Sequence, residues 1–267
     1  MKTLIYQVYT GKRKKLYDFC TASVKAYADR IGADYIVQRQ PILMIKPDVF
    51  QTNRSRESYE KYGGFLPIYE KENAFSYLKS YDQIAIIDAD IYIRTDCKDS
   101  IFAATGTDTD FAGVLERTIP AKSEYVKKLA NYTRMQYAHP GIKNMFNWQN
   151  PAGADFYNMG LMVINKSISK YLRGETPQQF LRRPKFKAFI DGMGPWKWST
   201  DQTLLNVWIK EEKMKVNNLH WKWNALYSAI PDDKVKEANF IHFFLKDKLP
   251  NQGENVEAVI EELGIKK

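Results

Sequence analysis

The stretch Tyr81-Asp82-Gln83-Ile84-Ala85-Ile86-Ile87-Asp88-Ala89-Asp90 carries the most informative pattern in this sequence of 267 residues. Its middle is an almost unbroken apolar run, which is typical of a parallel strand that is covered on both faces. Two carboxylates follow at once, and in an open parallel sheet ligands bind beyond the carboxyl ends of the strands. The stretch therefore predicts a buried central strand that ends at a functional site.

Asp88 and Asp90 suggest metal chemistry at the end of this strand. Two carboxylates at positions i and i+2 can converge on one cation where an extended backbone bends. Oxygen ligands at such a place suit Mg²⁺ or Mn²⁺ together with a bound diphosphate. Solvated carboxylates at a strand end form the same short pattern, so the pair alone leaves both interpretations open.

The amino-terminal residues predict a parallel sheet. Residues 4–9 form an apolar, β-branched and aromatic run that ends before Thr10, which is typical of a strand and a turn. Apolar residues then recur every three or four positions over 16–31 and Gly32 follows, so a helix is expected there. A short strand at 35–37 completes a strand–helix–strand unit, in which the two strands lie parallel.

The rest of the chain continues this alternation of strands and helices. A loop is expected at 46–66, helices at 68–78 and 201–209, and strands at 160–165 and 239–245. Residues 111–150 are interpreted as an inserted or variable region that is a candidate for shaping an acceptor site. Because no internal repeat or linker is visible, we expect one α/β domain over residues 1–267.

The net charge of +9, from 40 basic and 31 acidic residues, comes from short clusters that are spread along the chain. No nucleic-acid motif accompanies them, so no nucleic-acid partner is expected. Scattered charge of this kind fits solvated faces, or attraction to a nucleotide diphosphate, an acidic glycan or an anionic membrane surface. Two cysteines and the lack of a long apolar run favour a reducing compartment, and we expect a cytoplasmic location without a membrane span.

His242 is the third candidate metal ligand. It follows an apolar strand-like run, and a neutral imidazole is a good ligand beside two carboxylates. A buried structural histidine is the alternative, and the residues around His242 do not by themselves decide between the two.

Four segments together resemble a known family of enzymes. Residues 81–90 resemble the YDxxxxxDAD core of metal-dependent glycosyltransferases with the GT-A fold, and the nearest pattern is glycosyltransferase family 8, which includes glycogenin and bacterial lipooligosaccharide galactosyltransferases. Residues 156–165 are similar to the family's xxNxGVMVIN strand, 199–206 to its DQxxLN helix start, and 241–248 to its HxxGxxKPW signature. The four segments occur in the family's order and span most of residues 1–250.

The resemblance implies a single Rossmann-like GT-A domain and a role for several individual residues. It implies that Asp88, Asp90 and His242 hold Mn²⁺ or Mg²⁺ and that Lys248 holds the diphosphate. It also implies that Asn158 faces the donor sugar, that Asp201 contacts its hydroxyls, and that Gln202 lies near its reacting face. The other residues expected at the donor are Tyr9, Thr10, Lys71, Ala89, Gly160 and Lys246.

Three departures from the family pattern affect these expectations. Leu245 stands where the family has a glycine and no proline directly follows Lys248, so Lys246 could substitute for Lys248. The sequence Tyr9-Thr10-Gly11-Lys12 replaces the family's aspartate that helps to read the base. The family's basic residue upstream of the Asp pair falls near Glu72 by counting, and Lys71 is its neighbour.

The expected function is therefore metal-dependent transfer of a hexose from a nucleotide diphosphate sugar, with a UDP-sugar as the expected donor, to a hydroxyl acceptor in glycan biosynthesis. The resemblance implies retention at the anomeric carbon, with Asp201 and Gln202 as candidate catalytic residues. One alternative is a non-catalytic module that binds a nucleotide sugar or a glycan. Another is a haloacid dehalogenase-type phosphatase, although that family places its Asp pair on the first strand and follows it with Gly-Thr or Gly-Val, where this chain has Ile91-Tyr92.

Overall fold

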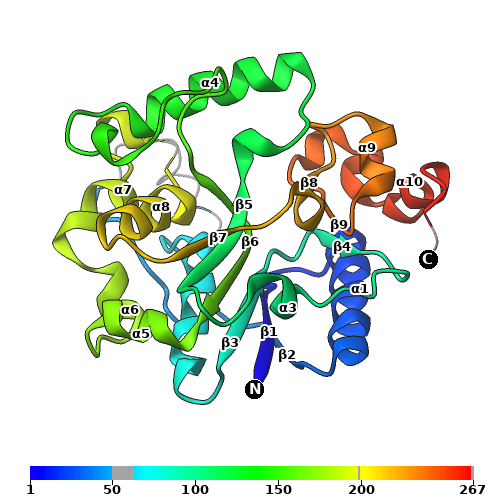
Figure 1. The fold of residues 1–267 in the computed structure, drawn as a ribbon, viewed down its shortest axis with the longest axis horizontal. Helices are drawn as coiled ribbons and strands as arrows, with labels where there is room; N and C mark the ends of the chain where they lie inside the picture. The colour runs from blue at the N-terminus through cyan, green and yellow to red at the C-terminus, as the bar shows by residue number, and fades with distance from the viewer. Residues whose placement is uncertain (50–59, 61–62, 198, 266–267) are drawn as a thin grey trace.

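A computed structural model of the chain describes residues 1–49, 60, 63–197 and 199–265, and its centre is a β-sheet (Figure 1). The strands are β1 (Thr3–Val8), β2 (Asp34–Gln38), β3 (Gln83–Ile87), β4 (Ile91–Ile93), β5 (Phe111–Leu115), β6 (Tyr157–Asn165), β7 (Val216–Asn218), β8 (Ala225–Leu226) and β9 (Phe240–His242). The α-helices are α1 (Lys15–Ile31), α3 (Ile101–Thr105), α4 (Ser123–Tyr137), α5 (Ser169–Leu172), α6 (Pro177–Leu181), α7 (Lys187–Asp191), α8 (Asp201–Glu211), α9 (Asp232–Glu237) and α10 (Val256–Glu262). The 3₁₀ helices are η1 (Pro67–Lys79), η2 (Glu116–Thr118), η3 (Lys143–Met145), η4 (Lys166–Ile168), η5 (Pro184–Phe186), η6 (Gly194–Trp196), η7 (Trp221–Trp223), η8 (Lys246–Lys248) and η9 (Pro250–Gly253).

The main sheet has the strand order β2-β1-β3-β6-β5-β7 in the described part of the chain. β1 is parallel to β2 and β3, and β5 is parallel to β7, whereas β6 runs antiparallel to both of its neighbours. The predicted α/β class, with a central and mostly parallel sheet flanked by helices, is confirmed.

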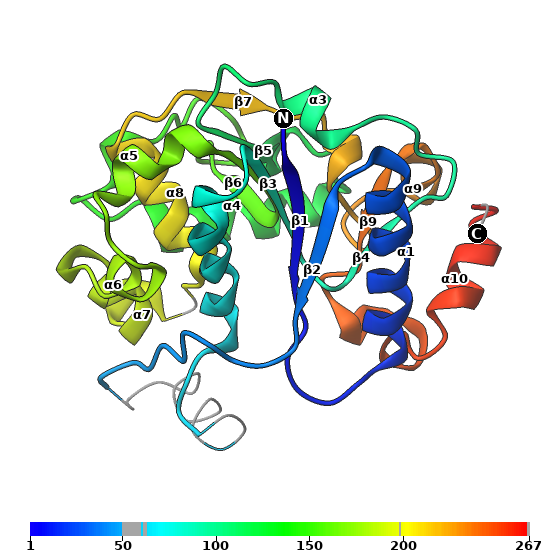
Figure 2. The ribbon, with the colours of Figure 1, turned by 90° about the horizontal axis from the view of Figure 1, so that it is seen from below.

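β3 is buried on both faces, as its apolar sequence predicts. Ile84 and Ile86 pack in the core on the side of η1 and α8, and Ala85 and Ile87 pack in the core on the side of α1 and α10. Figure 2 shows these two layers of helices on opposite sides of the sheet. Because both faces of β3 are covered, the first position after it that can carry a charged side chain is at its end, where Asp88 begins the next loop.

The β1–α1–β2 unit also forms as the sequence predicts. α1 buries the face that carries Leu16, Cys20, Val24 and Tyr27. Gly32 ends the helix with a φ of 68°, and its N–H donates to carbonyl groups of the last turn. A residue with a side chain adopts this left-handed conformation at a cost, which explains a glycine at this position.

A second, three-stranded sheet, with the order β4-β9-β8, brings a distant part of the chain to the end of β3. The strand that the sequence predicts at 239–245 is shorter and lies in this sheet instead of the main one. β4 and β9 are antiparallel, and Ile91 lies directly opposite His242. This pairing places the histidine beside the loop that carries the two aspartates.

The prediction of an inserted region over 111–150 was wrong for its first five residues. Phe111–Leu115 forms β5, a fully buried strand between β6 and β7. Ala112 and Gly113 in its middle are residue types that strands usually lack, and they weaken the strand signal of this short run. The segment leaves the sheet only at Glu116, where η2 begins, and α4 follows.

Two further expectations concern the segment before β3 and the membrane. The helix expected at 68–78 is present as the 3₁₀ helix η1. Residues 50–59, 61 and 62 of the loop expected at 46–66 lie outside the described residues. In the described ranges, no helix combines the length and the apolar character that a membrane crossing requires.

Asp110 ties β5 to the elements around it. Its buried carboxylate accepts hydrogen bonds from the side chains of Ser167, Lys170 and Tyr171 and from the backbone N–H of Lys215, at 2.7–3.0 Å. Burial by itself would raise the pKa of this carboxyl group, but the four hydrogen bonds lower it to about 2. The ionised carboxylate of Asp110 is therefore more stable in the folded protein than in the unfolded chain.

Replacing Asp110 by Asn should lower the free energy of unfolding at pH 7 by about 2 kcal/mol, because the pKa of this group is depressed by folding. The stabilisation is complete above the ordinary carboxyl pKa of about 4 and is lost as the pH falls toward 2. Urea unfolding of both proteins at pH 7, 4 and 3 should therefore show a difference that shrinks below pH 4. Asp108→Asn, at an exposed neighbour, is the control, and a gap that is constant with pH would contradict the account.

Candidate active site

The loop between β3 and β4 bends so that Asp88 and Asp90 reach one place. The Asp88 N–H donates to the carbonyl of Gly160 at 2.8 Å, and the Asp88 carbonyl accepts from the N–H of Ile91 at 3.1 Å and from Nε2 of Gln7 at 3.1 Å. With its backbone groups satisfied in this way, the loop is held at the carboxyl ends of β1 and β3.

His242 completes a three-residue group. Its Nε2 lies 3.3 Å from Oδ1 of Asp90 and 3.8 Å from Oδ2 of Asp88. One potential ligand atom from each of the three residues lies within 4.8 Å of the others. The three residues that the resemblance implies as metal ligands are therefore together, although about 150 residues separate the pair from the histidine in sequence.

Gly160 allows the histidine to take this position. A Cβ atom built on Gly160 would lie 2.2 Å from Cε1 and 2.5 Å from Nδ1 of His242, closer than real atoms approach. The imidazole thus packs against bare backbone of β6, so a glycine is needed there for a steric reason. The structure places the expected residue Gly160 behind the metal group.

Lys71 is buried in the same site. Its Nζ lies 2.9 Å from Oδ1 of Asp88, 2.7 Å from Oδ2 of Asp201 and 3.0 Å from the carbonyl of Met159. Burial by itself would lower the pKa of this lysine, but the carboxylates of Asp201 and Asp88 raise it above its ordinary value. The ammonium group therefore stays charged and holds both carboxylates.

The carboxyl and imidazole groups shift one another's protonation. Burial raises the pKa of Asp88, Lys71 opposes that change, and the charge of Asp90 adds to it. Burial would lower the pKa of His242, but Asp90 and Asp88 raise it above its ordinary value. The close approach of Asp88, Asp90 and His242 therefore favours one positive charge at this place. That charge is either a proton on His242 or a cation between the three side chains.

A cavity of 570 Å³ opens from the aspartate pair along the end of β1. Such a volume is within the range of small-molecule sites, which is about 300–1,000 Å³. Six of the residues expected at the donor line it, namely Tyr9, Thr10, Lys71, Asp88, Ala89 and Asp90. Lys12 and Lys14 also contribute to its wall, so three lysines face a site for which a diphosphate was predicted.

A second cavity, of 480 Å³, is lined by Asn158 of β6. Its wall includes Gln202 and the aromatic side chains of Tyr125, Tyr132 and Phe244. Because Tyr125 and Tyr132 belong to α4, part of the predicted 111–150 region does shape a cavity beside the site.

Glu116 lines the second cavity and was not identified from the sequence. Its buried carboxylate accepts hydrogen bonds from the Tyr125 hydroxyl at 2.6 Å and from Nδ2 of Asn158 at 3.0 Å. Burial raises the pKa of Glu116, and these two hydrogen bonds oppose the rise. The available signal was an acidic residue directly after the apolar run of β5, the same pattern that identified Asp88 after β3.

Asp201 and Gln202 begin α8, where Thr200 caps the helix by accepting the Gln202 N–H. The Asp201 side chain is 2% exposed and is ion-paired with Lys71, so it helps to hold the ammonium group in place. Oε1 of Gln202 accepts the N–H of Met159 at 3.1 Å, which fixes this side chain against β6. Of the two expected catalytic residues, only Gln202 lines either of the cavities described above.

The structure does not bring Lys248 to the site. Its side chain is exposed and its ammonium lies 3.9 Å from the carboxylate of Asp247. Among the described residues, the walls of both cavities are formed without it. The neighbouring Leu245, which replaces the family's glycine, itself lines the second cavity, and the side chain of Lys246 lies outside the described residues.

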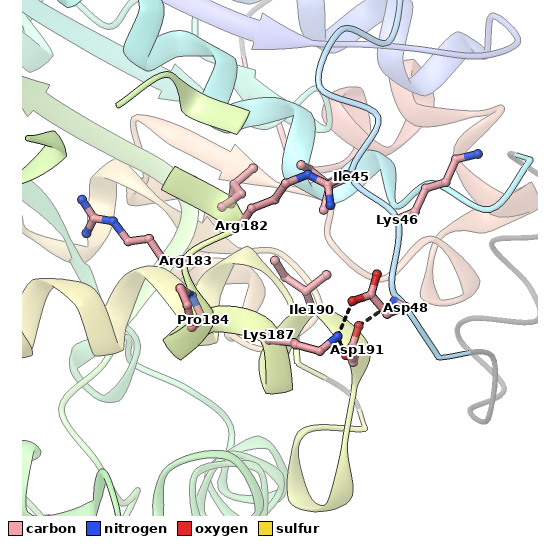
Figure 3. A pocket seen from close by; sticks show the side chains of 10 residues that line it. Ile45, Lys46, Asp48, Arg182, Arg183, Pro184, Lys187, Ile190 and Asp191 are labelled. Atoms are coloured by element: carbon pink, nitrogen blue, oxygen red, sulfur yellow. Dashed lines mark hydrogen bonds and ion pairs between the residues drawn. The ribbon is translucent and has the colours of Figure 1, made fainter. Parts of the chain in front are cut away.

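The basic cluster at 182–187 lines a further cavity of 210 Å³ (Figure 3). Figure 3 shows Lys187 between Asp48 and Asp191, with ion pairs to both. Arg183 is ion-paired with Glu175 at 2.7 Å, and Lys185 with Glu211 at 2.5 Å. Since the chain's own carboxylates neutralise most of this cluster, it is better explained as an ion-paired face than as a surface for an anionic partner.

Comparison with known proteins gives similar structures but no sequence relative. No protein-family model and no curated protein matches the chain. Mouse xyloside xylosyltransferase 1, in its apo form, matches with a TM-score of 0.50 and 11% identity, over 94% of this chain and all of the other. A glycosyltransferase involved in the glycosylation of the major capsid of PBCV-1 matches at 0.48, with 12% identity and coverage of 97% and 100%. An active-site mutant of LgtC matches at 0.44, with 13% identity and coverage of 90% and 87%.

At these identities the similarity defines the fold. The chain has the GT-A glycosyltransferase fold, as the four sequence segments predict. Its three candidate metal ligands lie at the end of β3, which is where ligands are expected in an open sheet of this kind.

Proposed function

We propose that the chain is a metal-dependent glycosyltransferase that transfers a hexose from a nucleotide diphosphate sugar to a hydroxyl acceptor. The observation that carries this proposal is the convergence of Asp88, Asp90 and His242 at the edge of a cavity that Lys71 also lines. A second cavity with a different lining, which includes Asn158, gives donor and acceptor separate places in this proposal.

The three residues fit a divalent cation. Neighbouring ligand atoms around an octahedral ion with bonds of about 2.1 Å lie about 3 Å apart. The separations of 3.3 and 3.8 Å from His242 to the two carboxylates are close to that spacing. Two carboxylate oxygens with one imidazole nitrogen suit Mn²⁺, and Mg²⁺ is the second candidate. When bound, the cation would supply Lewis-acid charge for the diphosphate leaving group.

The residues of the first cavity would hold the donor by the charge of its diphosphate. Lys12 and Lys14 provide positive charge for the diphosphate. Tyr9 holds the loop that carries them, because its hydroxyl accepts the Lys14 N–H at 2.6 Å and the Arg39 guanidinium covers its ring at 4.2 Å. We keep a UDP-sugar as the proposed donor.

The residues of the second cavity would hold the acceptor. Tyr125, Tyr132 and Phe244 offer aromatic surface of the kind on which sugar rings pack, and Glu116 offers a carboxyl group for a hydroxyl. Gln202, fixed between this cavity and β6, is the candidate nearest to the reacting face of the sugar, with retention as the proposed outcome. The proposed acceptor is a glycan. The cytoplasmic location of the protein and its contact with an anionic membrane stay predictions.

A thermal-shift screen tests this proposal and its main alternatives. UDP, GDP, CDP and ADP are added with and without Mn²⁺ to the native protein, to Asp90→Asn and to the exposed-site control Asp247→Asn. A nucleotide at 100 times its dissociation constant should stabilise the protein by about 2.7 kcal/mol, only with Mn²⁺ and not in Asp90→Asn. If no nucleotide stabilises the protein, the donor site is contradicted and a glycan-binding module becomes the better account. Nucleotide stabilisation without sugar transfer would indicate a non-catalytic module, and phosphomonoester hydrolysis would indicate the phosphatase.

A further inference from the structure

A continuous chain of hydrogen bonds runs from the second cavity to the metal group. It joins five side chains in the order Tyr125, Glu116, Asn158, Asn224 and His242, with distances of 2.6, 3.0, 2.9 and 3.0 Å. The members come from α4, η2, β6, the end of η7 and β9. Asn224 has no exposed surface and lines neither cavity, and no metal or substrate role was expected for it.

The backbone of β6 determines which way each amide in this chain points. The N–H of Gly160 donates to one atom of the Asn158 side chain at 3.0 Å, so that atom must be the oxygen. The amide nitrogen of Asn158 then donates to Glu116, which is consistent with a carboxylate acceptor. The same Asn158 oxygen accepts the amide nitrogen of Asn224 at 2.9 Å.

The orientation of Asn224 in turn determines the state of His242. Because its amide nitrogen donates to Asn158, the Asn224 oxygen faces Nδ1 of His242 at 3.0 Å. An oxygen acceptor requires that Nδ1 carry a hydrogen. The lone pair of the neutral ring is then on Nε2, the nitrogen that faces Asp90 and Asp88.

We propose that Asn224 is a positioning residue that holds His242 in the tautomer that can bind a cation through Nε2. The inference rests on the proposed function, since it concerns the same metal group. If the Asn224 amide were reversed, its nitrogen would face Nδ1, and the ring would direct an N–H at the two carboxylates instead of a lone pair. Partners of this kind on metal-bound histidines typically affect metal affinity 10- to 100-fold.

Two variants at one position separate positioning from simple packing. Asn224→Leu fills similar space but offers His242 no acceptor, so Mn²⁺ affinity should fall 10- to 100-fold. Asn224→Asp keeps an acceptor for Nδ1 and removes the donor to Asn158, so it should lose stability while keeping Mn²⁺ affinity within about threefold of the native value, because the hydrogen bond to the ligand is retained. If Asn224 only fills space, Mn²⁺ affinity should instead follow stability in both variants.

Asn206→Leu is the matched control. Asn206 is equally buried, and its side chain bonds the backbone of Tyr157 in the same strand β6 at 2.7 and 2.9 Å and the carbonyl of Gln202 at 2.8 Å, rather than His242. Its replacement should destabilise the protein while leaving the affinity for Mn²⁺ unchanged. An equal loss of affinity in Asn206→Leu and Asn224→Leu would overturn the inference.

The tautomer is measured without any cation. Nitrogen-15 NMR of the imidazole in cation-free protein, at a pH where the ring is neutral, should show hydrogen on Nδ1 in the native chain and a mixture in Asn224→Leu. An Nε2–H tautomer in the native chain would overturn the inference even if Mn²⁺ binds. If the native protein binds no Mn²⁺ but has the Nδ1–H tautomer, the proposed metal function fails while the positioning role of Asn224 is supported.

Discussion

Asp90→Asn should reduce glycosyl transfer about a thousandfold or more while the protein keeps its fold. The Asp90 side chain is partly exposed, at 16%, and its ion-pair partner in the described chain is His242. Replacing this carboxylate by an amide therefore removes one negative charge from the metal group and places no new charge in the protein interior. A loss of about 4 kcal/mol of cation-derived stabilisation in the transition state corresponds to roughly a thousandfold in rate.

The measurement is release of the nucleotide diphosphate in the presence of a sugar acceptor, at saturating Mn²⁺ and over a range of donor concentrations. Circular dichroism melting checks that the variant is folded, and Asp247→Asn controls for loss of an exposed carboxylate nearby in sequence. A variant that is folded and transfers sugar at more than a tenth of the native rate would show that Asp90 is not a ligand of an essential cation.

Local sequence patterns were sufficient for the part of the fold that surrounds β3. The apolar run before Asp88 predicted the strand β3, which the structure buries between two layers of helices. The spacing of apolar residues, followed by Gly32, predicted α1. These signals work because each depends on residues that are close in sequence: burial of both faces demands an unbroken run, and a helix demands one apolar face. Asp88 and Asp90 could be assigned to a site for the same reason, since they follow directly on the run.

The rest of the site depends on contacts between distant segments. His242 reaches Asp90 only because β9 pairs with β4 in the second sheet, and no local pattern encodes that pairing. Family resemblance identified the histidine, but it did not identify Glu116 or Asn224, which are joined to the site by hydrogen bonds to other side chains. It also predicted Lys248 at the site, whereas the structure places three other lysines along the first cavity.

Lys71 shows how stability and function are joined in this site, and Lys71→Met should damage both. The methionine would leave Asp88 and Asp201 without the ammonium that lies within 3 Å of each. Removing one member of a buried ionic group typically costs 3–5 kcal/mol, so unfolding by urea at pH 7 should show a loss of about that size. Because burial and Asp90 already raise the pKa of Asp88, the loss should become smaller as the pH falls and Asp88 takes up a proton.

A double variant separates the two roles of Lys71. Adding Asp201→Asn to Lys71→Met removes the charge that is most deeply buried, at 2% exposure, so part of the lost stability should return. Transfer should stay low in the double variant, because the charge that lines the donor cavity beside Asp88 is still missing. Lys79→Met, at the exposed end of the same helix η1, should change neither property.

Two outcomes would contradict these roles of Lys71. If the free energy of unfolding of Lys71→Met lies within about 1 kcal/mol of the native value, the ammonium is not needed to hold the two carboxylates. If the double variant regains transfer together with stability, Lys71 supports the fold and has no direct role at the donor.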